Sequence, residues 1–460
     1  MGTLAERLVV IGGDAAGMSA ASQARRRRGP GDLRIVAFEK GAHASYSACG
    51  IPYLVGGEVS DVESLISRRP EVFRDELDID LRLRSEVVEI DLDRRAVAVR
   101  DERGGRGWEP FDQLVVATGA VPARPDLPGA DAEGVYGVQT LDDGIALLRA
   151  LEDEPRRAVV VGGGYIGLEM AEAMVRRGLE VSLVDAAEQP MGTLDPDMGA
   201  LVADALRDLG VKVHLGERIE GFEESGGRVT AARTENRTLP ADLVVLGLGT
   251  RPNSALAEAA GIPVGETSGI VTDRRMRTPV EGVWAAGDCV ENFHRVSRRP
   301  VAIALGTHAN KQGRVAGINI GGGHASFPGV VGTAVSKICE YEVARTGLTT
   351  AAAEKAGFEP VGGIVESTTR AGYYPGARQM KIKTIADRGT GRLLGAQIVG
   401  QEGAAKRIDA LAVAIWHEMT VEEMSGLDLS YAPPFAPVWD PVLIAARKAS
   451  EHIDRLDGKA

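Results

Sequence analysis

The chain has 460 residues, of which 44% are hydrophobic and 58 are glycine, and this length accommodates two to four domains with buried cores. A formal net charge of −12 at pH 7 argues against binding to nucleic acid or anionic membranes, because both need a basic surface. No signal peptide or apolar run of about 18 residues is recognisable, and the three cysteines are far apart without a CxxC pair, so we expect a cytoplasmic protein without a disulfide framework or metal site.

Residues 8–40 are predicted to form a strand, a glycine turn, a helix and a second strand. The turn GGDAAG contains the glycines that let a pyrophosphate approach a helix N-terminus: Gly12, Gly13 and Gly17. Glu39 ends the second strand 22 residues after Gly17, near the position where an acid binds a ribose hydroxyl. Asp14 replaces the middle glycine of the GxGxxG pattern. The segment predicts a dinucleotide site, and a plain structural turn is the alternative.

Cys49 lies in the stretch SYSACGIPY, residues 45–53. A buried, inert cysteine is one interpretation and a redox thiol is the other. The Gly and Pro residues predict a turn that opens a helix, where backbone N–H groups and the helix dipole would stabilise a thiolate. Cys289 and Cys339 are expected to be small core residues.

A second unit of the same kind is predicted over residues 157–185. It has the full fingerprint, Gly162, Gly164 and Gly167, and Asp185 follows Gly167 by 18 residues. An acid there binds a ribose 2′-hydroxyl and repels a 2′-phosphate, and no arginine follows in AAEQP. NADH is therefore favoured, with NADPH as the alternative.

Three further motifs connect these units. LVVATGA at 114–120 and LVVLGLGTRPN at 243–253 each predict a strand that ends in a glycine turn. GVWAAGDCVE at 282–291 places Asp288 just after another strand. In this order and spacing, the motifs resemble those of the two-dinucleotide-fold flavoprotein disulfide reductases. The resemblance implies an α/β fold in which the first Rossmann-like domain holds FAD, the second holds NAD(P)H, and Asp288 binds the ribityl chain.

SYSACGIPY is similar to the SFxxCGxPY signature of the single-cysteine branch, which contains coenzyme A-disulfide reductases, water-forming NADH oxidases and NADH peroxidases. Reductases with a disulfide beside the flavin carry two cysteines, whereas only Cys49 is present here. Peroxidases and oxidases carry a histidine in the first glycine turn, where this chain has Ala15. The resemblance thus implies a single redox thiol and lowers the expectation of peroxide chemistry.

Two C-terminal segments, AGYYPGA and LSYAPPFAPVWDP, resemble those of coenzyme A-disulfide reductases. This implies that Tyr431 and one of Tyr373 or Tyr374, with Tyr373 preferred, reach the partner's cysteine in a homodimer and donate a proton to a leaving thiolate. A tyrosine before two prolines that only caps a loop is the alternative. Trp439 stands near a place where some relatives have a basic residue.

The basic run at residues 25–28 lies about where this subfamily meets the phosphates of coenzyme A. Its alternative is a solvated helix end. The residues expected to contact substrate are Arg25, Arg28, Ser45 and Ala48.

The resemblance also implies the cofactor contacts. For FAD they are Gly12, Gly13, Ala15, Ala16, Gly17, Glu39, Lys40, Ser45, Ala117, Thr118, Gly119, Asp288, Thr307, His308 and Ala309. For NAD(P)H they are Gly162, Gly164, Tyr165, Ile166, Gly167, Glu169, Asp185 and Gly249. Tyr165 is expected to cover the flavin and Glu169 to touch the nicotinamide. His308 is either a flavin contact or a structural residue at a helix start.

We expect an FAD domain over residues 1–120 and 252–326, an NAD(P)H domain over 121–251, an α+β dimerisation domain over 327–446 and a tail over 447–460. The expected activity is FAD-dependent transfer of electrons from NAD(P)H through Cys49 to a small disulfide, foremost coenzyme A disulfide. An NADH oxidase and a coenzyme A persulfide or polysulfide reductase are the alternatives with the same cysteine. An electron-transfer flavoprotein or redox sensor would not need Cys49.

Overall fold

The computed structural model describes residues 5–459, so residues 1–4 of the expected FAD domain and Ala460 of the expected tail lie outside the described residues. A parallel five-stranded sheet forms the first unit, with the order β18, β7, β1, β2, β3. Four of its strands are mainly buried apolar runs, because helices cover the sheet, whereas the edge strand β3 is only partly buried. They are β1 (Glu6–Ile11), β2 (Leu33–Phe38), β3 (Ile79–Arg82), β7 (Gln113–Val116) and β18 (Val283–Ala285).

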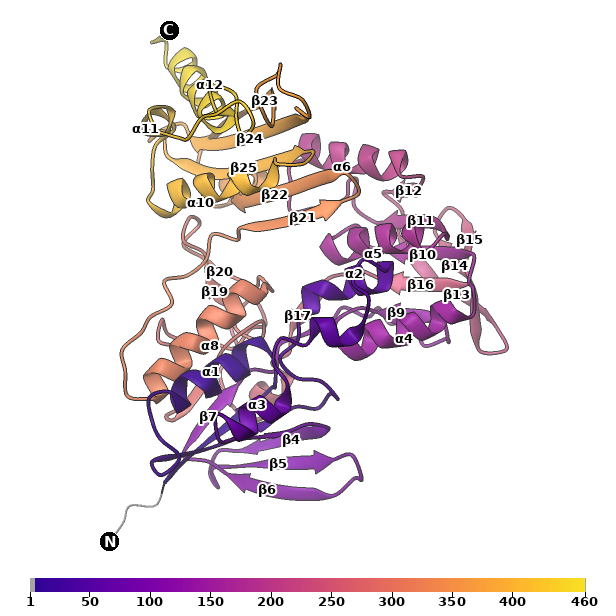
Figure 1. The fold of residues 1–460 in the computed structure, drawn as a ribbon, viewed down its shortest axis with the longest axis vertical. Coiled ribbons are helices and arrows are strands. Elements are labelled where there is room, and N and C mark those ends of the chain that lie inside the picture. The colour runs from indigo at the N-terminus through magenta and orange to yellow at the C-terminus, as the bar shows by residue number, and fades with distance from the viewer. Residues whose placement is uncertain (1–4, 460) are drawn as a thin grey trace.

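Two helices, α1 (Ala15–Arg25) and α8 (Gly306–Ile320), lie side by side on this unit in the lower part of Figure 1. They approach closely because α8 presents glycine to α1: a Cβ on Gly313 would overlap the Ala16 carbonyl oxygen. The first turns of both helices meet at the carboxyl ends of β7 and β18, in a cluster of small residues: Ala15, Ala16, Ala117, Ala286 and Ala309.

Shorter elements surround this sheet. An antiparallel meander follows β3 and lies at the bottom of Figure 1: β4 (Ser85–Asp91), β5 (Ala96–Asp101) and β6 (Arg106–Pro110). The other short elements are η1 (Ala48–Gly50), α2 (Ile51–Gly56), η2 (Val62–Leu65), α3 (Pro70–Asp75), α7 (Ala255–Ala259), β19 (Asn292–Phe293) and β20 (Pro300–Val301).

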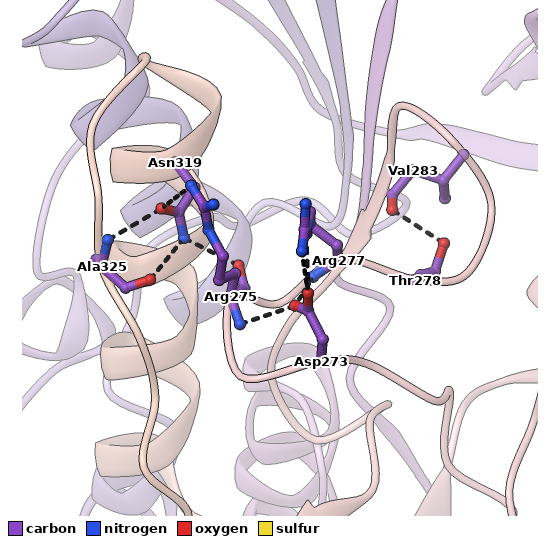
Figure 2. Close-up of polar contacts among 7 residues, drawn as sticks. All are labelled: Asp273, Arg275, Arg277, Thr278, Val283, Asn319 and Ala325. Atoms are coloured by element: carbon purple, nitrogen blue, oxygen red, sulfur yellow. Dashed lines mark hydrogen bonds and ion pairs between the residues drawn. The ribbon is translucent and has the colours of Figure 1, made fainter.

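A group of hydrogen bonds holds the loop before β18 against the end of α8 (Figure 2). The Asn319 amide donates to the carbonyl oxygens of Arg275 and Ala325, both at 3.0 Å, and its oxygen accepts from Ala325 N at 3.0 Å. Asp273 closes the same loop by accepting from the backbone and guanidinium of Arg277. Thr278 Oγ1 donates to Val283 O at 2.9 Å, which ties the loop to β18. These hydrogen bonds fix β18, the strand that precedes Asp288.

The second unit repeats the parallel plan, with the order β12, β11, β10, β16, β9. Its strands are β9 (Val135–Gly137), β10 (Arg157–Val161), β11 (Glu180–Asp185), β12 (Lys212–Leu215) and β16 (Leu243–Leu246). Its helices are α4 (Leu141–Glu152), α5 (Tyr165–Arg176) and α6 (Pro196–Asp208). A small antiparallel sheet adds β13 (Ile219–Ser225), β14 (Arg228–Thr234) and β15 (Thr238–Pro240).

The chain crosses between these units twice, and the two crossings pair with each other. β8 (Ala120–Pro122) and β17 (Thr250–Pro252) form an antiparallel ribbon. The crossings therefore fall beside the expected limits at residues 120 and 252. No helix within residues 5–459 is long and apolar enough to cross a membrane.

The third unit is an antiparallel sheet with the order β21, β22, β25, β24, β23 and helices packed on it, at the top of Figure 1. Its strands are β21 (Ala334–Ile338), β22 (Tyr341–Gly347), β23 (Pro360–Thr368), β24 (Gln379–Asp387) and β25 (Leu393–Gly400). The remaining elements are α9 (Thr350–Lys355), η3 (Ala405–Arg407), α10 (Ile408–Trp416), α11 (Val421–Ser425) and α12 (Pro441–Leu456).

The expected tail at 447–460 needs correction. Helix α12 runs through residue 446 without a break and continues to Leu456. Ala449 and Ile453 are buried in the core of the third unit. The apolar face of this amphipathic helix therefore continues the third unit to the end of α12.

A buried ion pair joins the second and third units. Asp195, 3% exposed, accepts from Lys383 Nζ at 2.8 Å and from Thr350 Oγ1 at 2.6 Å, and its N–H donates to Gln397 Oε1 at 2.8 Å. Burial by itself would raise the pKa of Asp195, but Lys383 and Thr350 hold this pKa below its ordinary value. The carboxylate is therefore charged at pH 7 and fixes the start of α6 on the third sheet.

We predict that Asp195→Ala lowers the free energy of unfolding by about 2–4 kcal/mol, because it leaves the N–H and hydroxyl of Thr350 without their acceptor and removes the buried one of the two carboxylates that pair with Lys383. Urea denaturation at pH 7 measures the effect. Asp197 also pairs with Lys383 but is 44% exposed at its side chain, so Asp197→Ala is the matched control with a loss below about 1 kcal/mol. Equal losses of unfolding free energy in the two variants would contradict the stabilising role of the buried Asp195.

Candidate active site

The first glycine turn lies between β1 and α1 and is packed against the end of β7. Gly12 has φ +110°, and a Cβ at this position would overlap the carbonyl oxygen of Ala117. A Cβ on Gly17 would overlap the Gly12 carbonyl oxygen, so α1 approaches the turn as closely as backbone allows. Glu39 Oε2 accepts from Gly13 N at 2.8 Å, which fixes its carboxylate beside the turn. Within the described chain no side chain caps α1, and such a helix N-terminus attracts a phosphate.

Two buried polar atoms near this turn have no hydrogen-bond partner among the described residues. One is Asp288 Oδ1, just after β18, and burial raises the pKa of Asp288 to about 6. The other is Nδ1 of His308 in the first turn of α8; burial lowers the pKa of His308 to about 4, so its ring is neutral at pH 7. Buried polar atoms are normally satisfied, and ribityl hydroxyls and a flavin ring edge would supply the missing partners. These residues therefore fit FAD.

The other expected FAD residues lie around the same site. Thr118 and Gly119 are tied to the second crossing, since Thr118 Oγ1 donates to Asn253 O at 2.6 Å and Asn253 N donates to Gly119 O at 2.9 Å. Lys40 is exposed just beyond Glu39. The remaining small or polar positions fall in the first turns of α1 and α8: Ala15, Ala16, Thr307 and Ala309.

The second glycine turn has the same construction. A Cβ on Gly162 would overlap the carbonyl oxygen of Gly247. A Cβ on Gly167 would overlap the carbonyl oxygen of Gly162. Asp185 accepts from Gly163 N at 2.6 Å and from Ala187 N at 2.9 Å, so its carboxylate is fixed at the end of β11. The other expected NAD(P)H contacts are Gly164, which precedes α5, Ile166 in the first turn of α5, and Gly249, which lies between β16 and β17 and has φ +84°.

Helix α5 carries two polar side chains toward the centre of the molecule. The Tyr165 hydroxyl is buried without a hydrogen-bond partner among the described residues, and burial raises the pKa of Tyr165. Glu169 Oε1 accepts from Ser336 Oγ on β21 at 2.6 Å, and burial raises the pKa of Glu169. The N-terminal half of α5 thus carries acceptors and donors at the place where a nicotinamide is expected.

Cys49 lies in η1, directly before α2, and is exposed. Ala48 beside it is also exposed. Desolvation by its surroundings, then Glu169, Asp288 and Asp14, raise the pKa of Cys49. A backbone hydrogen bond at Cys49 acts in the opposite direction and favours the thiolate, as the turn before α2 is expected to do. The stabilisation of a thiolate at this turn stays a prediction.

The other two cysteines are buried. Cys289 Sγ donates to Val116 O at 3.5 Å and Ala286 O at 3.4 Å, and burial raises the pKa of Cys289 to about 11. Cys339 lies in the core between the second and third units, where burial and Glu172 raise the pKa of Cys339 to about 12. Both are inert thiols. In residues 5–459, no group of three or more His, Cys, Asp or Glu side chains is arranged to hold a metal ion.

The structure does not leave Arg25 and Arg28 free for substrate. Arg25 is 8% exposed, and its guanidinium donates to the carbonyl oxygens of Leu77, Asp78 and Arg28. Arg28 pairs with the Glu6 carboxylate and donates to Asp32 O. Both arginines hold α1 against the ends of the sheet, so the expected substrate contacts at these two positions are corrected.

A pocket of about 270 Å³ lies instead on the adjacent face of α1. Three arginines line the pocket: Arg26, Arg68 and Arg314. The other lining residues are polar: Ser19, Ser22, Gln23 and Asn310. Positions 19, 22, 23 and 26 share one helical face, and this spacing could have identified Arg26 from the sequence. Arg68 could not be identified in this way, because it comes from a loop 42 residues further along the chain.

The predicted tyrosines lie on the third unit. Tyr373 is 78% and Tyr431 is 46% exposed, and a hydrogen bond with Tyr373 raises the pKa of Tyr431. Tyr374 is half-buried and its N–H donates to Ala371 O at 2.7 Å. Exposed apolar side chains follow Tyr431: Phe435, Val438 and Trp439.

Two dinucleotide folds and one exposed cysteine beside the first of them define a flavin-dependent pyridine-nucleotide oxidoreductase. Residues 6–313 match the family model of the pyridine nucleotide-disulphide oxidoreductases, and residues 333–441 match the dimerisation domain of this family. The chain belongs to the pyridine nucleotide-disulphide oxidoreductase family and is an FAD-dependent enzyme that uses NAD(P)H.

Several relatives match the chain over nearly its full length. A protein of Pyrococcus abyssi named NAD(P)H sulfur oxidoreductase (CoA-dependent) is 41% identical over 96% of this chain and 97% of its own. A Methanocaldococcus jannaschii protein named NADH oxidase is 37% identical over 97% and 99% of the two chains. The solved structure of an NAD-dependent persulfide reductase from A. fulgidus has a TM-score of 0.94 at 39% identity and covers 98% of this chain and 84% of that one.

We predict that Asp288→Asn stabilises the FAD-free protein at pH 7 by about 1–3 kcal/mol and weakens FAD binding. The folded-state pKa of Asp288 is raised to about 6, so the folded state keeps a proton that the unfolded chain releases above about pH 4. The stability of the native protein consequently falls as the pH rises from about 4 to about 6, and the variant lacks this component. Urea denaturation at pH 4 and pH 7 measures the free energy of unfolding of the native protein and of Asp288→Asn. If the two proteins differ by the same free energy at both pH values, the prediction is wrong.

Proposed function

We propose that this enzyme passes electrons from NADH through Cys49 to a small sulfur substrate carried by coenzyme A, either a disulfide or a persulfide. The observation that carries this proposal is the arginine pocket beside the Cys49 loop. Arg68 lines the pocket, and its backbone N–H donates to Ser45 O at 3.2 Å, four residues before Cys49. A thiol with several phosphates matches this arrangement, with its phosphates on the arginines and its sulfur at Cys49. The printed names of the Pyrococcus abyssi and A. fulgidus relatives support it.

In this proposal, Cys49 carries out the sulfur chemistry. The chemistry that bound FAD supplies is the conversion of a hydride from NAD(P)H into an electron pair for sulfur. Cys49, as the thiolate, attacks the substrate S–S bond; a mixed disulfide forms and one thiolate leaves and takes a proton. Two electrons from NADH then split the mixed disulfide, which restores Cys49 and releases the second thiol. The sum is NADH + H⁺ + RSSR′ → NAD⁺ + RSH + R′SH, and R′SH is H₂S for a persulfide.

We further propose that the active enzyme is a homodimer that completes each site across its interface. Tyr373 and Tyr431 would approach the Cys49 of the other copy and donate the proton that the leaving thiolate needs. The match to a dimerisation domain and the exposed side chains around Tyr431 support this arrangement. The unit that pairs would run from residue 327 to the end of α12, beside an FAD unit of residues 1–120 and 252–326 and an NAD(P)H unit of 121–251.

Asp185 supports NADH as the preferred donor. Its carboxylate is fixed beside the second turn by backbone N–H groups, so a ribose 2′-hydroxyl finds an acceptor and a 2′-phosphate meets a like charge. The M. jannaschii relative is named an NADH oxidase. Oxygen consumption with NADH in the absence of a disulfide, compared with disulfide reduction, distinguishes the two activities.

We predict that Cys49→Ser reduces NADH-dependent coenzyme A disulfide reduction by roughly a hundredfold or more, because no sulfur remains to form the mixed disulfide. FAD content and NADH-dependent reduction of ferricyanide, which needs no thiol, stay close to those of the native enzyme. Cys289→Ser is the matched control, with unchanged disulfide reduction. Full activity in Cys49→Ser would exclude the thiol mechanism.

We predict that Arg26→Ala raises KM for coenzyme A disulfide roughly tenfold with little change in kcat, because one charge-assisted contact to phosphate is worth about 1.4 kcal/mol or more. The neutral substrate 2-hydroxyethyl disulfide shows no such change. Arg34→Ala is the control, since Arg34 is an exposed arginine on β2 outside the pocket. A KM that is equal in all three proteins would place the phosphates elsewhere.

A further inference from the structure

Strand β21 of the third unit lies against α5, the helix that carries the expected nicotinamide contact, Glu169. Two carboxylates of α5 hold the strand. Glu169 Oε1 accepts from Ser336 Oγ at 2.6 Å, and Glu172 Oε2 accepts from Cys339 N, just after β21, at 2.7 Å. Residues three apart on a helix share a face, so both hydrogen bonds fix the same side of α5 on the third unit.

Ser336 is a buried polar residue, 7% exposed, and it faces α5. The neighbouring positions in β21, Val335 and Lys337, are exposed, so the alternation of the strand directs Ser336 inward. Its hydroxyl has a single hydrogen, which is committed to Glu169. A distance of 2.6 Å is typical of a hydroxyl that donates to a carboxylate, the stronger kind of hydrogen bond.

This hydrogen bond leaves half of the Glu169 carboxylate for a ligand. Oε1 is occupied by Ser336, and Oε2 has no hydrogen-bond donor among residues 5–459. Glu169 is half-buried and borders a small cleft with Pro52 and Tyr53 of α2, the helix that follows Cys49. The primary amide of nicotinamide has N–H donors, and a carboxylate oxygen is an acceptor for them.

We propose that Ser336 is a positioning residue of the nicotinamide site, which turns Glu169 so that its second oxygen accepts from the nicotinamide amide. Ser336 lies within the match to the dimerisation domain, so a strand of this domain sets the orientation of a side chain in the NAD(P)H unit. Without the hydroxyl, the ligand itself has to order the Glu169 side chain, and this ordering costs affinity. The inference rests on the expected contact of Glu169 and on NADH as the donor in the proposed function, and not on the chemistry of Cys49.

Three ligands that differ in the group presented to Glu169 test this role. NAD⁺ has the amide, its 3-acetylpyridine analogue has a methyl ketone without an N–H in the same place, and ADP-ribose lacks the nicotinamide ring. Their dissociation constants are measured on the FAD-loaded enzyme by isothermal titration calorimetry, which needs no turnover. A residue that only supports the fold affects all three ligands alike, whereas a residue that positions Glu169 affects NAD⁺ alone.

The variants separate the hydroxyl from the packing of β21. Ser336→Ala removes the hydroxyl, and Ser336→Thr keeps it in a residue that suits a strand. Thr346→Val is the matched control, because it removes a buried hydroxyl of β22 that hydrogen-bonds to Thr333 and not to α5. Glu169→Ala, alone and combined with Ser336→Ala, shows whether Ser336 acts through Glu169.

We expect Ser336→Ala to weaken NAD⁺ binding about fivefold, the worth of one hydrogen bond, and to leave the other two ligands within about twofold of the native affinity. Ser336→Thr and Thr346→Val bind all three ligands as the native enzyme does. Glu169→Ala weakens NAD⁺ binding at least as much as Ser336→Ala, and the double variant binds no more weakly than Glu169→Ala, because the positioned group is already gone.

Native NAD⁺ affinity in Ser336→Ala, or an equal loss for NAD⁺ and ADP-ribose, would overturn the positioning role. Native NAD⁺ affinity in Glu169→Ala would overturn it as well, since the contact through which Ser336 acts would be absent. These results leave the sulfur chemistry untouched. Retained coenzyme A disulfide reduction in Cys49→Ser is a separate outcome, which would overturn the proposed function instead.

Discussion

The backbone contact between the first glycine turn and the Cys49 loop determines where the sulfur of Cys49 lies. Gly12 and Gly17 allow α1 to close on the turn, and the Gly13 carbonyl oxygen then accepts from Ser45 N. A side chain at either glycine would displace α1, and with it the cofactor turn and the loop together. The same backbone geometry that admits a pyrophosphate thus also sets the position of the thiol. Chemistry at Cys49 and cofactor binding at the turn depend on one local constraint.

Charge is distributed unevenly around this constraint. Carboxylates gather where the cofactor and Cys49 lie, since Asp14, Glu169 and Asp288 all act on the thiol. Arginines gather in the pocket on the neighbouring face of α1, at Arg26 and Arg314 with Arg68. A polyanionic thiol substrate would be attracted to these arginines, which lie beside the loop that carries Cys49.

Much of the fold could be predicted from the sequence, because glycine spacing and strand length encode it locally. Both Rossmann-like units and the position of Asp288 after a strand follow from short motifs. The arginines of the pocket could not be identified in the same way, because Arg25 and Arg26 are adjacent in sequence but face the protein interior and the pocket respectively. The pKa of Cys49 is raised by burial and by acids from elements far apart in the chain, which no local motif shows. The C-terminal helix is encoded by apolar residues at helical spacing, such as Val442, Ala449 and Ile453, but its packing on the third sheet depends on strands far from it in sequence.

The proposed sulfur chemistry has a covalent intermediate that a mass measurement can detect. Holoenzyme with a free Cys49 thiol and no reductant is mixed anaerobically with one equivalent of coenzyme A disulfide, without NADH, and quenched in acid for peptide mass spectrometry. We predict a coenzyme A mixed disulfide on the peptide that contains Cys49, which disappears when NADH is added before the quench. Turnover without any adduct on Cys49, or with the adduct on Cys289 or Cys339, would contradict the central role of this cysteine.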